Sequence, residues 1–348
     1  MAEDDRELGR IRASLYGGAI GDALGAEIEF WSLDRIRARF PDGIDRILPH
    51  DGVRAAITDD TQMTLFTAEG AIRSVMRSIA KWGGNAAVVA GGVVHHALLR
   101  WYVTQGESSP IAWVDHVGLV RDPRLHRRRA PGATCLSALA AGREFGEWAQ
   151  NDSKGCGTIM RVAPVGLLLN LQQVSQAPDE TSHLTHAHPA ERNAAQAFAL
   201  LLSFVMEGLP LSRALETLRR AHLDAHVLKA IDAARDARPD GNAATVESLG
   251  GGWVAEEALS IAIYAALVGR DFEEGLRIAV THSGDSDSTG AIAGNLLGLL
   301  YPEQVMAHLW RQQIECADLI GRIATDLHRA RRPDENFVRD LWRFYPGV

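Results

Sequence analysis

The sequence predicts an all-α protein, a compact orthogonal bundle of many helices. Apolar residues recur at intervals of three and four in one segment after another, and short β-branched runs with strict alternation are nearly absent. Helices with one buried face are therefore expected in five segments: 8–19, 194–205, 211–222, 258–265 and 292–299.

The apolar segment 86–103 fits either a buried strand or a buried helix. Its length and the alanines and leucines of its second half favour the helix, because strands usually span about four to eight residues. No segment is both long and low in complexity, so nothing marks a linker. We expect a single domain over residues 1–348.

Composition and charge exclude several classes of protein. The 348 residues are 46% hydrophobic and 23% charged, as in globular domains, and the net charge of −8 speaks against a nucleic-acid partner. Cys135, Cys156 and Cys316 are too few and too scattered for a disulfide framework or a zinc knuckle, which indicates a reducing compartment. Because neither a signal peptide nor an apolar stretch of about 20 residues is present, we expect a cytoplasmic protein with no membrane contact.

Two predicted helices carry glycine at every fourth position. The first has Gly17, Gly21 and Gly25, and the later one has Gly290, Gly294 and Gly298. A glycine inside a helix costs about 1 kcal/mol relative to alanine, so three on one face need a reason. Either they are scattered packing glycines, or the two faces approach each other closely and bring the polar residues at their ends together.

Two clusters of acids and hydroxyls each open a predicted helix, at 58–61 (TDDT) and 283–289 (SGDSDST). Taken singly, each resembles an ordinary helix cap. An Asp-x-Asp pair in a Gly/Ser loop also offers the oxygen ligands that Mg²⁺, Mn²⁺ or Ca²⁺ prefers. The four carboxylates of the two clusters are consistent either with exposed caps or with one dinuclear metal site.

Four further motifs carry weaker signals. Asp22 and Glu29 stand among apolar neighbours, where a carboxyl acquires a raised pKa suited to acid–base chemistry unless it is simply solvated. The loop at 153–161 offers backbone N–H groups to a phosphate but matches neither a P-loop nor a dinucleotide fingerprint. His186 and His188 suit hydrogen bonding or stacking better than zinc. The run Arg127–Arg129 is expected to be a solvated basic turn, and the alternative is that it helps to position an anionic substrate.

Five segments, in this order, resemble the ADP-ribosylglycohydrolases, relatives of the dinitrogenase reductase-activating glycohydrolase and the ADP-ribosyl-acceptor hydrolases: GDALGAEIEF, TDDTQMT, SKGCGTIMRVAP, LTHAHP and GDSDSTGAIAGNLLG. The likeness runs from about Leu8 to Tyr301, so we expect a core at about 8–301 and C-terminal helices at 302–348. It implies an all-α fold that holds two divalent cations, Mg²⁺ or Mn²⁺, in a central cleft.

The resemblance also implies roles for particular residues. The metal ligands would be Thr58, Asp59, Asp60, Asp285, Asp287 and Ser288. Glu29 would be the catalytic acid, and ADP-ribose would bind at Ser153, Gly155, Cys156, Gly157 and His186. Ser288 replaces a commoner threonine, and Cys156 replaces a frequent asparagine. The segment 107–129 has no match and is expected to hold an additional catalytic aspartate, Asp115 or Asp122.

The activity implied is metal-dependent removal of ADP-ribose from protein side chains, by cleavage at the ribose C1″ through an oxocarbenium-like state. Arginine is favoured as the modified residue, since the GDALGAEIEF and LTHAHP segments look closest to the arginine-directed branch and carboxylates suit a guanidinium. The expected partners are an ADP-ribosylated protein and ADP-ribose. The alternatives are a non-catalytic ADP-ribose-binding module, a serine-linked or O-acetyl-ADP-ribose hydrolase, and a metal-dependent phosphoesterase.

Overall fold

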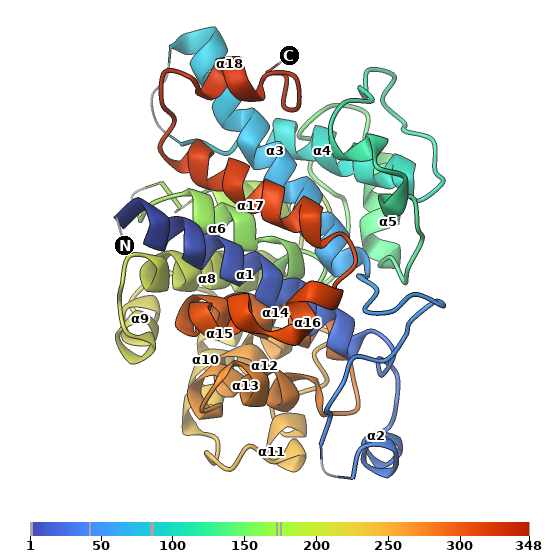
Figure 1. Cartoon of the computed structure of the whole chain (residues 1–348), viewed down its shortest axis with the longest axis vertical. Coiled ribbons are helices and arrows are strands. Elements are labelled where there is room, and N and C mark those ends of the chain that lie inside the picture. The colour runs from blue at the N-terminus through green and yellow to red at the C-terminus, as the bar shows by residue number, and fades with distance from the viewer. Residues whose placement is uncertain (1–2, 42, 84–86, 172, 175, 348) are drawn as a thin grey trace.

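Helices make up all the regular structure of the described residues, which are 3–41, 43–83, 87–171, 173–174 and 176–347 of this computed structural model (Figure 1). Within these ranges the only β-type pairings are two isolated bridges, His50 with Val53 and Gly155 with Val254. The all-α prediction is confirmed.

The helices follow one another along the whole chain. In order they are α1 (Glu3–Gly25), α2 (Leu33–Arg39), α3 (Asp59–Trp82), α4 (Gly91–Thr104), η1 (Leu119–Arg121), η2 (Pro123–Leu125), α5 (Ala133–Ala141), η3 (Ile159–Arg161), α6 (Ala163–Leu168), α7 (Ala177–Ser182), α8 (Pro189–Met206), α9 (Leu211–Leu218), α10 (Ala225–Asp236), α11 (Ala243–Glu247), α12 (Ala255–Val268), α13 (Phe272–Val280), α14 (Ser286–Leu300), α15 (Pro302–Ala307), α16 (Leu309–Gln313), α17 (Ala317–Arg331) and α18 (Phe337–Leu341).

The predicted helical segments are found in α1, α8, α9, α12 and α14. The third prediction extends too far, because α9 ends at Leu218 and a turn follows before α10 begins. The ambiguous segment 86–103 is a helix from Gly91 onward, within α4, although its first residue lies outside the described residues. Since α4 spans fourteen residues, the choice of a buried helix over a strand was correct.

The pairing of α1 with α14 lies at the centre of the molecule. Every residue of α14 from Ser286 to Leu299 is buried. Gly17 faces Gly294, and Gly21 faces Gly290, so closely that a Cβ atom on any of these glycines would collide with a backbone carbonyl of the other helix. The scattered-glycine alternative is therefore wrong, and the two backbones are in direct contact.

The two helices run antiparallel, since Gly17 and Gly25 of α1 lie opposite Gly294 and Ser286 of α14 respectively. The C-terminal end of α1 therefore meets the N-terminal end of α14. This brings the segment around Glu29 next to the acids that open α14, as the close approach of the two glycine faces predicted.

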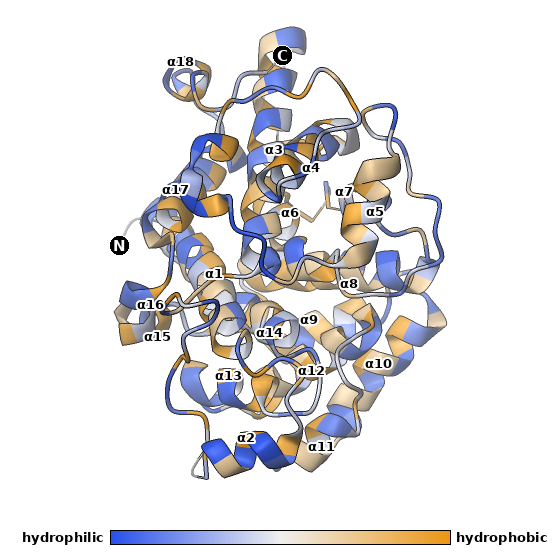
Figure 2. Cartoon of the chain, turned by 90° about the vertical axis from the view of Figure 1, so that its right-hand side faces the viewer, coloured by the Kyte–Doolittle hydropathy of each residue, from blue (hydrophilic) through white to orange (hydrophobic). Residues whose placement is uncertain are grey.

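The other helices form layers around this pair. Helices α12 and α13 pack against α14, α15 and α17 pack against α1, and α3 packs against α4 and α17 (Figure 1). The small helix α2 lies at the periphery and is mostly hydrophilic (Figure 2). None of the helices in the described part of the chain is long and apolar enough to cross a membrane.

We predict that Gly294→Ala lowers the free energy of unfolding by about 3 kcal/mol or more, because the new methyl group overlaps the Gly17 carbonyl and must separate the two backbones. Urea denaturation followed by circular dichroism measures the change. The matched control is Gly9→Ala in α1, where a Cβ meets nothing within 4 Å and better helix propensity is expected to stabilise by up to about 1 kcal/mol. Equal effects of the two substitutions would contradict the close contact.

Candidate active site

Three segments converge on one cavity of about 350 Å³. They are the turn after α1, the start of α3 and the start of α14. Five carboxyl groups line it, those of Glu29, Asp59, Asp60, Asp285 and Asp287. The other lining residues are Phe30, Ala130, Pro131, Gly132, Ala133, Thr134, Cys135, Gly155, Cys156, Gly157, Met160, His186, Trp253 and Ser288. The lining contains no lysine or arginine, so no basic side chain of the cavity pairs with these acids.

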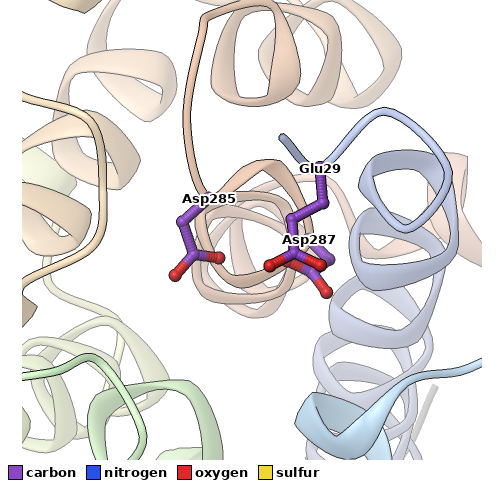
Figure 3. A group of neighbouring side chains, drawn as sticks. All are labelled: Glu29, Asp285 and Asp287. Carbon is purple, nitrogen blue, oxygen red and sulfur yellow. The ribbon is translucent and has the colours of Figure 1, made fainter. Parts of the chain in front are cut away.

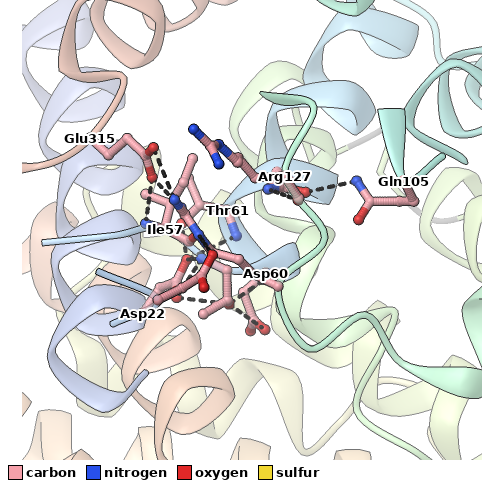
Figure 4. A network of polar contacts seen from close by, with 11 residues as sticks. Asp22, Ile57, Asp60, Thr61, Gln105, Arg127 and Glu315 are labelled. Carbon is pink, nitrogen blue, oxygen red and sulfur yellow. Dashed lines mark hydrogen bonds and ion pairs between the residues drawn. The ribbon is translucent and has the colours of Figure 1, made fainter. Parts of the chain in front are cut away.

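The start of α3 is fastened to α1 by Asp22, which is fully buried. Its carboxylate accepts hydrogen bonds from the backbone N–H groups of Thr58 (3.0 Å) and Thr61 (3.1 Å) and from both hydroxyl groups (Figure 4). Burial raises the pKa of Asp22 to about 6, and these hydrogen bonds oppose that rise. Asp22 is thus neither solvated nor part of the cavity lining, and it anchors the helix that presents Asp59 and Asp60.

The start of α14 is capped by its own acids. The backbone N–H of Ser288 donates to Asp285 Oδ1 (3.2 Å) and to Asp287 Oδ1 (2.9 Å). The backbone N–H of Asp285 donates to the Gly251 carbonyl (2.9 Å), and the Cys156 thiol donates to Asp285 Oδ2 (2.9 Å). The helix cap expected from the sequence is present, and it holds both carboxylates at the cavity.

Glu29 completes an acidic triad. One carboxylate oxygen from each of Glu29, Asp285 and Asp287 lies within 4.8 Å of the others (Figure 3). Burial, followed by repulsion from Asp285 and Asp59, raises the pKa of Glu29 to about 8. Burial and neighbouring carboxylates likewise hold the pKa values of Asp59, Asp60 and Asp287 well above their usual range.

These residues fit a hard divalent cation. The donors are carboxylate and hydroxyl oxygens, and Asp60 Oδ1 is buried without a hydrogen-bond partner in the described part of the chain. Buried carboxylates of like charge are costly unless a positive charge offsets them. No basic side chain of the lining supplies that charge, and oxygen-only ligand sets suit Mg²⁺ or Mn²⁺.

The opposite wall is a glycine loop against a histidine. A Cβ on Gly157 would collide with the imidazole of His186, so only glycine allows the loop backbone this close. Burial and the charge of Arg161 lower the pKa of His186 to about 3, which keeps its ring neutral. His188 instead caps α8, accepting from the Ala190 N–H at 3.1 Å, as the preference for hydrogen bonding over zinc predicted.

The structure brings all but two of the predicted site residues into the cavity lining. Thr58 is buried behind it as the cap of α3, and Ser153 lies beside it, where its hydroxyl accepts from the Gly155 N–H at 3.3 Å. Sequence reasoning missed the segment 130–135, whose Gly132 N–H donates to Asp59 Oδ2 (3.2 Å), and also Phe30 and Trp253. The run of glycines at 250–252 was the available signal for Trp253.

The segment 107–129 supplies no acid to this cavity. Asp115 is ion-paired with Arg73 at 2.8 Å and lies near Arg100, and Asp122 is ion-paired with Arg124 at 2.8 Å. Neither aspartate lines the cavity, so the prediction that one of them serves catalysis has no support in the geometry.

The expectation of a solvated basic turn at Arg127–Arg129 is wrong for its last residue. Arg129 is buried, donates to the Ile57 carbonyl at 2.8 Å and forms an ion pair with Glu315. Glu315 also accepts from the Ile57 N–H (Figure 4). Arg129 therefore fastens the segment that leads into α3, and through it the position of Asp59.

With this geometry in place, the comparisons with known proteins decide the family. The family model described as ADP-ribosylglycohydrolase matches residues 3–336. The chain belongs to the ADP-ribosylglycohydrolase family. Membership in a family of glycohydrolases supports a hydrolase and accounts for the acidic cavity, since the family is generally metal-dependent.

Relatives with matching sequences cover nearly the whole length of this chain. The ADP-ribosylarginine hydrolase Tri1 of Serratia proteamaculans is 24% identical over 97% of this chain and 83% of its own. Tri1 of Pseudomonas putida is 24% identical over 95% and 81%. A solved chain described as an ADP-ribosylglycohydrolase-related protein complex aligns with a TM-score of 0.68 at 24% identity, over 94% of this chain and 99% of that one, which shows the same fold.

We predict a pH-dependent stability difference between the wild type and Glu29→Gln in the presence of a chelator. The folded protein keeps the Glu29 proton up to a pKa of about 8, whereas the unfolded chain loses it near 4.5. The folded state therefore binds more protons between these values, and the free energy of unfolding of the wild type falls, relative to the variant, as pH rises from about 4.5 to 8.

Denaturant titrations of both proteins at pH values from about 5 to 9, about one unit apart, measure this difference in the free energy of unfolding. Glu335→Gln, at an exposed position, controls for the loss of one negative charge. If the stability of the wild type relative to the variant stays constant or rises with pH, the Glu29 carboxylate is not destabilised by its surroundings.

Proposed function

We propose that this chain is a metal-dependent hydrolase that releases ADP-ribose from modified arginine side chains of proteins. The observation that carries the proposal is the cavity itself, with five carboxyl groups and no basic side chain opposite a glycine loop. Arginine specificity is further supported by the two Tri1 relatives, which are ADP-ribosylarginine hydrolases. The acids of the site are intact, which favours turnover over a non-catalytic binding module.

The proposed cations are two Mg²⁺ or Mn²⁺ ions, held by Thr58, Asp59, Asp60, Asp285, Asp287 and Ser288. The acids of the two helix starts face one cavity, and the unpartnered Asp60 Oδ1 leaves a ligand position free. When bound, such ions offset the carboxylate charge and polarise the oxygen atoms of the ribose hydroxyls and of water. The Thr58 hydroxyl donates its proton to Asp22 (2.8 Å) and accepts from the Asp60 N–H (3.3 Å), which leaves one lone pair of its oxygen for a cation.

The glycine loop is proposed to bind the ADP-ribose moiety. Gly155, Cys156 and Gly157 bring backbone to the cavity wall, where N–H groups suit a pyrophosphate. Ser153 shapes this loop through its hydrogen bond from Gly155. His186 is neutral, and its Nδ1 pairs with the Thr185 hydroxyl at 3.0 Å, which leaves Nε2 on the side of the loop for the ligand.

Glu29 is proposed to act as the general acid and base of the reaction. Hydrolysis breaks the bond between C1″ and the guanidine nitrogen, adds the oxygen of water to C1″ and returns a proton to the nitrogen. A carboxyl with a pKa near neutrality can both take and give that proton, and Glu29 lies at the cavity with its pKa raised to about 8 by burial and by its acidic neighbours. The closeness of Glu29 to Asp285 and Asp287 also suits a cation ligand, and the Glu29→Gln variant separates these roles.

We propose that residues 1–348 act as one catalytic unit in the cytoplasm. One continuous hydrophobic core contains residues from α1 through α18, including Ile11 and Leu341, which supports a single domain. The three cysteines are free thiols, which supports a reducing compartment.

We predict that the purified protein releases ADP-ribose faster from an arginine-modified protein than from a serine-modified one. EDTA is expected to abolish the release, and Mg²⁺ or Mn²⁺ is expected to restore it. Zinc is not expected to restore it, because the proposed ligands are all oxygens. Chromatography of the products distinguishes released ADP-ribose from released AMP. Release of AMP would indicate a phosphoesterase instead.

Asp287→Asn in the same assay is expected to lower metal affinity and activity together, since it removes one carboxylate of the acidic triad. Asp318→Asn, whose carboxylate is exposed on the outer surface, is the matched control. Full activity in excess chelator would refute the metal site, and faster release from serine would refute only the choice of linkage.

We predict that Glu29→Gln separates binding from turnover. The amide keeps the shape of the carboxyl but cannot exchange a proton, so hydrolysis is expected to fall by about 10²–10⁴-fold. Calorimetry with ADP-ribose in Mg²⁺ is expected to give a Kd within about threefold of the wild type. If Glu29→Gln weakens metal binding as much as it slows hydrolysis, Glu29 is a cation ligand. Near-normal turnover would assign the proton transfer to another carboxyl group.

A further inference from the structure

Two aromatic side chains form an exposed rim on the acidic cavity. Phe30, in the turn after α1, is 72% exposed, and Trp253, in the loop before α12, is 43% exposed. Their ring centroids lie 5.1 Å apart with an interplanar angle of 27°, and both residues line the cavity. Pairs of large apolar side chains that remain exposed beside a polar site commonly mark a binding surface.

The backbone of Phe30 favours a ligand role over a packing role. Its φ is +65°, a left-handed conformation that bulky L residues rarely adopt and that glycine adopts freely. The ring is mostly exposed, so burial in the core does not compensate for this conformation. Strained backbone that persists without a packing benefit is concentrated at functional sites.

The rim is tied directly to the acids of α14. Trp253 follows three glycines, and Gly251 packs against the indole while its carbonyl accepts from the Asp285 N–H. On the other side, the Leu33 N–H donates to the Ser283 hydroxyl at 2.7 Å, which connects the turn of Phe30 to the same acidic loop. The two rings are therefore held in place relative to the cleavage site.

Carboxyl groups line the cavity beside the rim, which favours a cationic ligand. Glu247 and Glu257 hold the loops that flank Trp253, through hydrogen bonds from the N–H groups of Ser283 and Gly251. The nearby Lys154 is ion-paired with Glu256, so it offers little free positive charge. Aromatic faces next to carboxylates bind guanidinium groups, and the guanidinium of Arg35 in α2 lies 3.7 Å from the centre of the neighbouring Trp31 ring.

We propose that Phe30 and Trp253 bind the guanidinium of the modified arginine and the basic peptide around it, and so select arginine-modified proteins. Phe30 follows Glu29 directly, which places its ring within one residue of the group proposed to act at the C1″–nitrogen bond. This inference rests on the proposed function, because it assigns the protein part of that substrate to a surface outside the ADP-ribose-binding loop.

The test compares Phe30→Gly and Trp253→Ala with the wild type on an arginine-modified protein, alongside calorimetry with free ADP-ribose. The KM for the modified protein is expected to rise about five- to thirtyfold in each variant, the range of one or two cation–π contacts, with kcat within about twofold. The Kd for ADP-ribose is expected to stay within about twofold of the wild type. Trp253→Phe is expected to restore most of the affinity.

Phe30→Gly also distinguishes binding from structure. Because glycine adopts a φ of +65° without strain, the variant is expected to melt at or above the temperature of the wild type while its KM rises. Trp113→Ala, at a residue that is 82% exposed and outside this cavity, is the matched control and is expected to leave KM unchanged.

The remaining outcomes overturn the inference in distinguishable ways. If the Kd for ADP-ribose rises as much as the KM for the modified protein, the rim binds the adenine of ADP-ribose instead. An unchanged KM in both variants would show that the rim does not bind the substrate. If the wild type itself does not cleave the arginine linkage, the proposed function fails first and the rim proposal falls with it. Cleavage of that linkage with normal KM in the variants refutes the rim alone.

Discussion

The direct contact between the backbones of α1 and α14 is the constraint on which the rest of the structure depends. Glycine steps on both helices remove every side chain that would keep them apart, as between Gly21 and Gly290. Close packing of this kind gains dispersion energy over the whole length of the pair and offsets the poor helix propensity of glycine. Its functional consequence is geometric, because it sets the start of α14 beside the turn that carries Glu29 and Phe30.

The acids of the cavity work against stability and therefore need this rigid support. Burial and mutual repulsion raise the pKa values of Asp59, Asp60 and Asp287, which means that the folded protein disfavours their charged forms. Two helix starts offset part of this cost through backbone N–H groups and their dipoles, and the rest is left for a ligand. Buried carboxyl groups that stay destabilised in this way are typical of functional sites.

Long-range anchors hold the loops that surround these acids. Arg129 ties the approach to α3 to Glu315, Asp22 ties α3 to α1, and the glycines before Trp253 tie the rim to Asp285. Each anchor is buried or half-buried and joins segments far apart in the chain. The side chains of the cavity and the aromatic rim can therefore occupy loops without losing their relative positions.

The sequence by itself determined the helical class, because helix periodicity is a local pattern whose physical meaning depends little on context. The glycine steps and the acidic motifs each left two interpretations open, and the expected site residues came from the resemblance to a family. The local patterns alone did not distinguish Asp22 from Glu29, or Arg129 from its two neighbours. Asp22 became an anchor and Glu29 a cavity residue only through the packing of α3 on α1, and Arg129 was buried by a partner 186 residues away. Trp253 joined the site from a loop without a recognised motif. The tertiary structure decided these cases because exposure, pKa and ion pairing depend on neighbours that long-range packing supplies and that spacing along one segment does not encode.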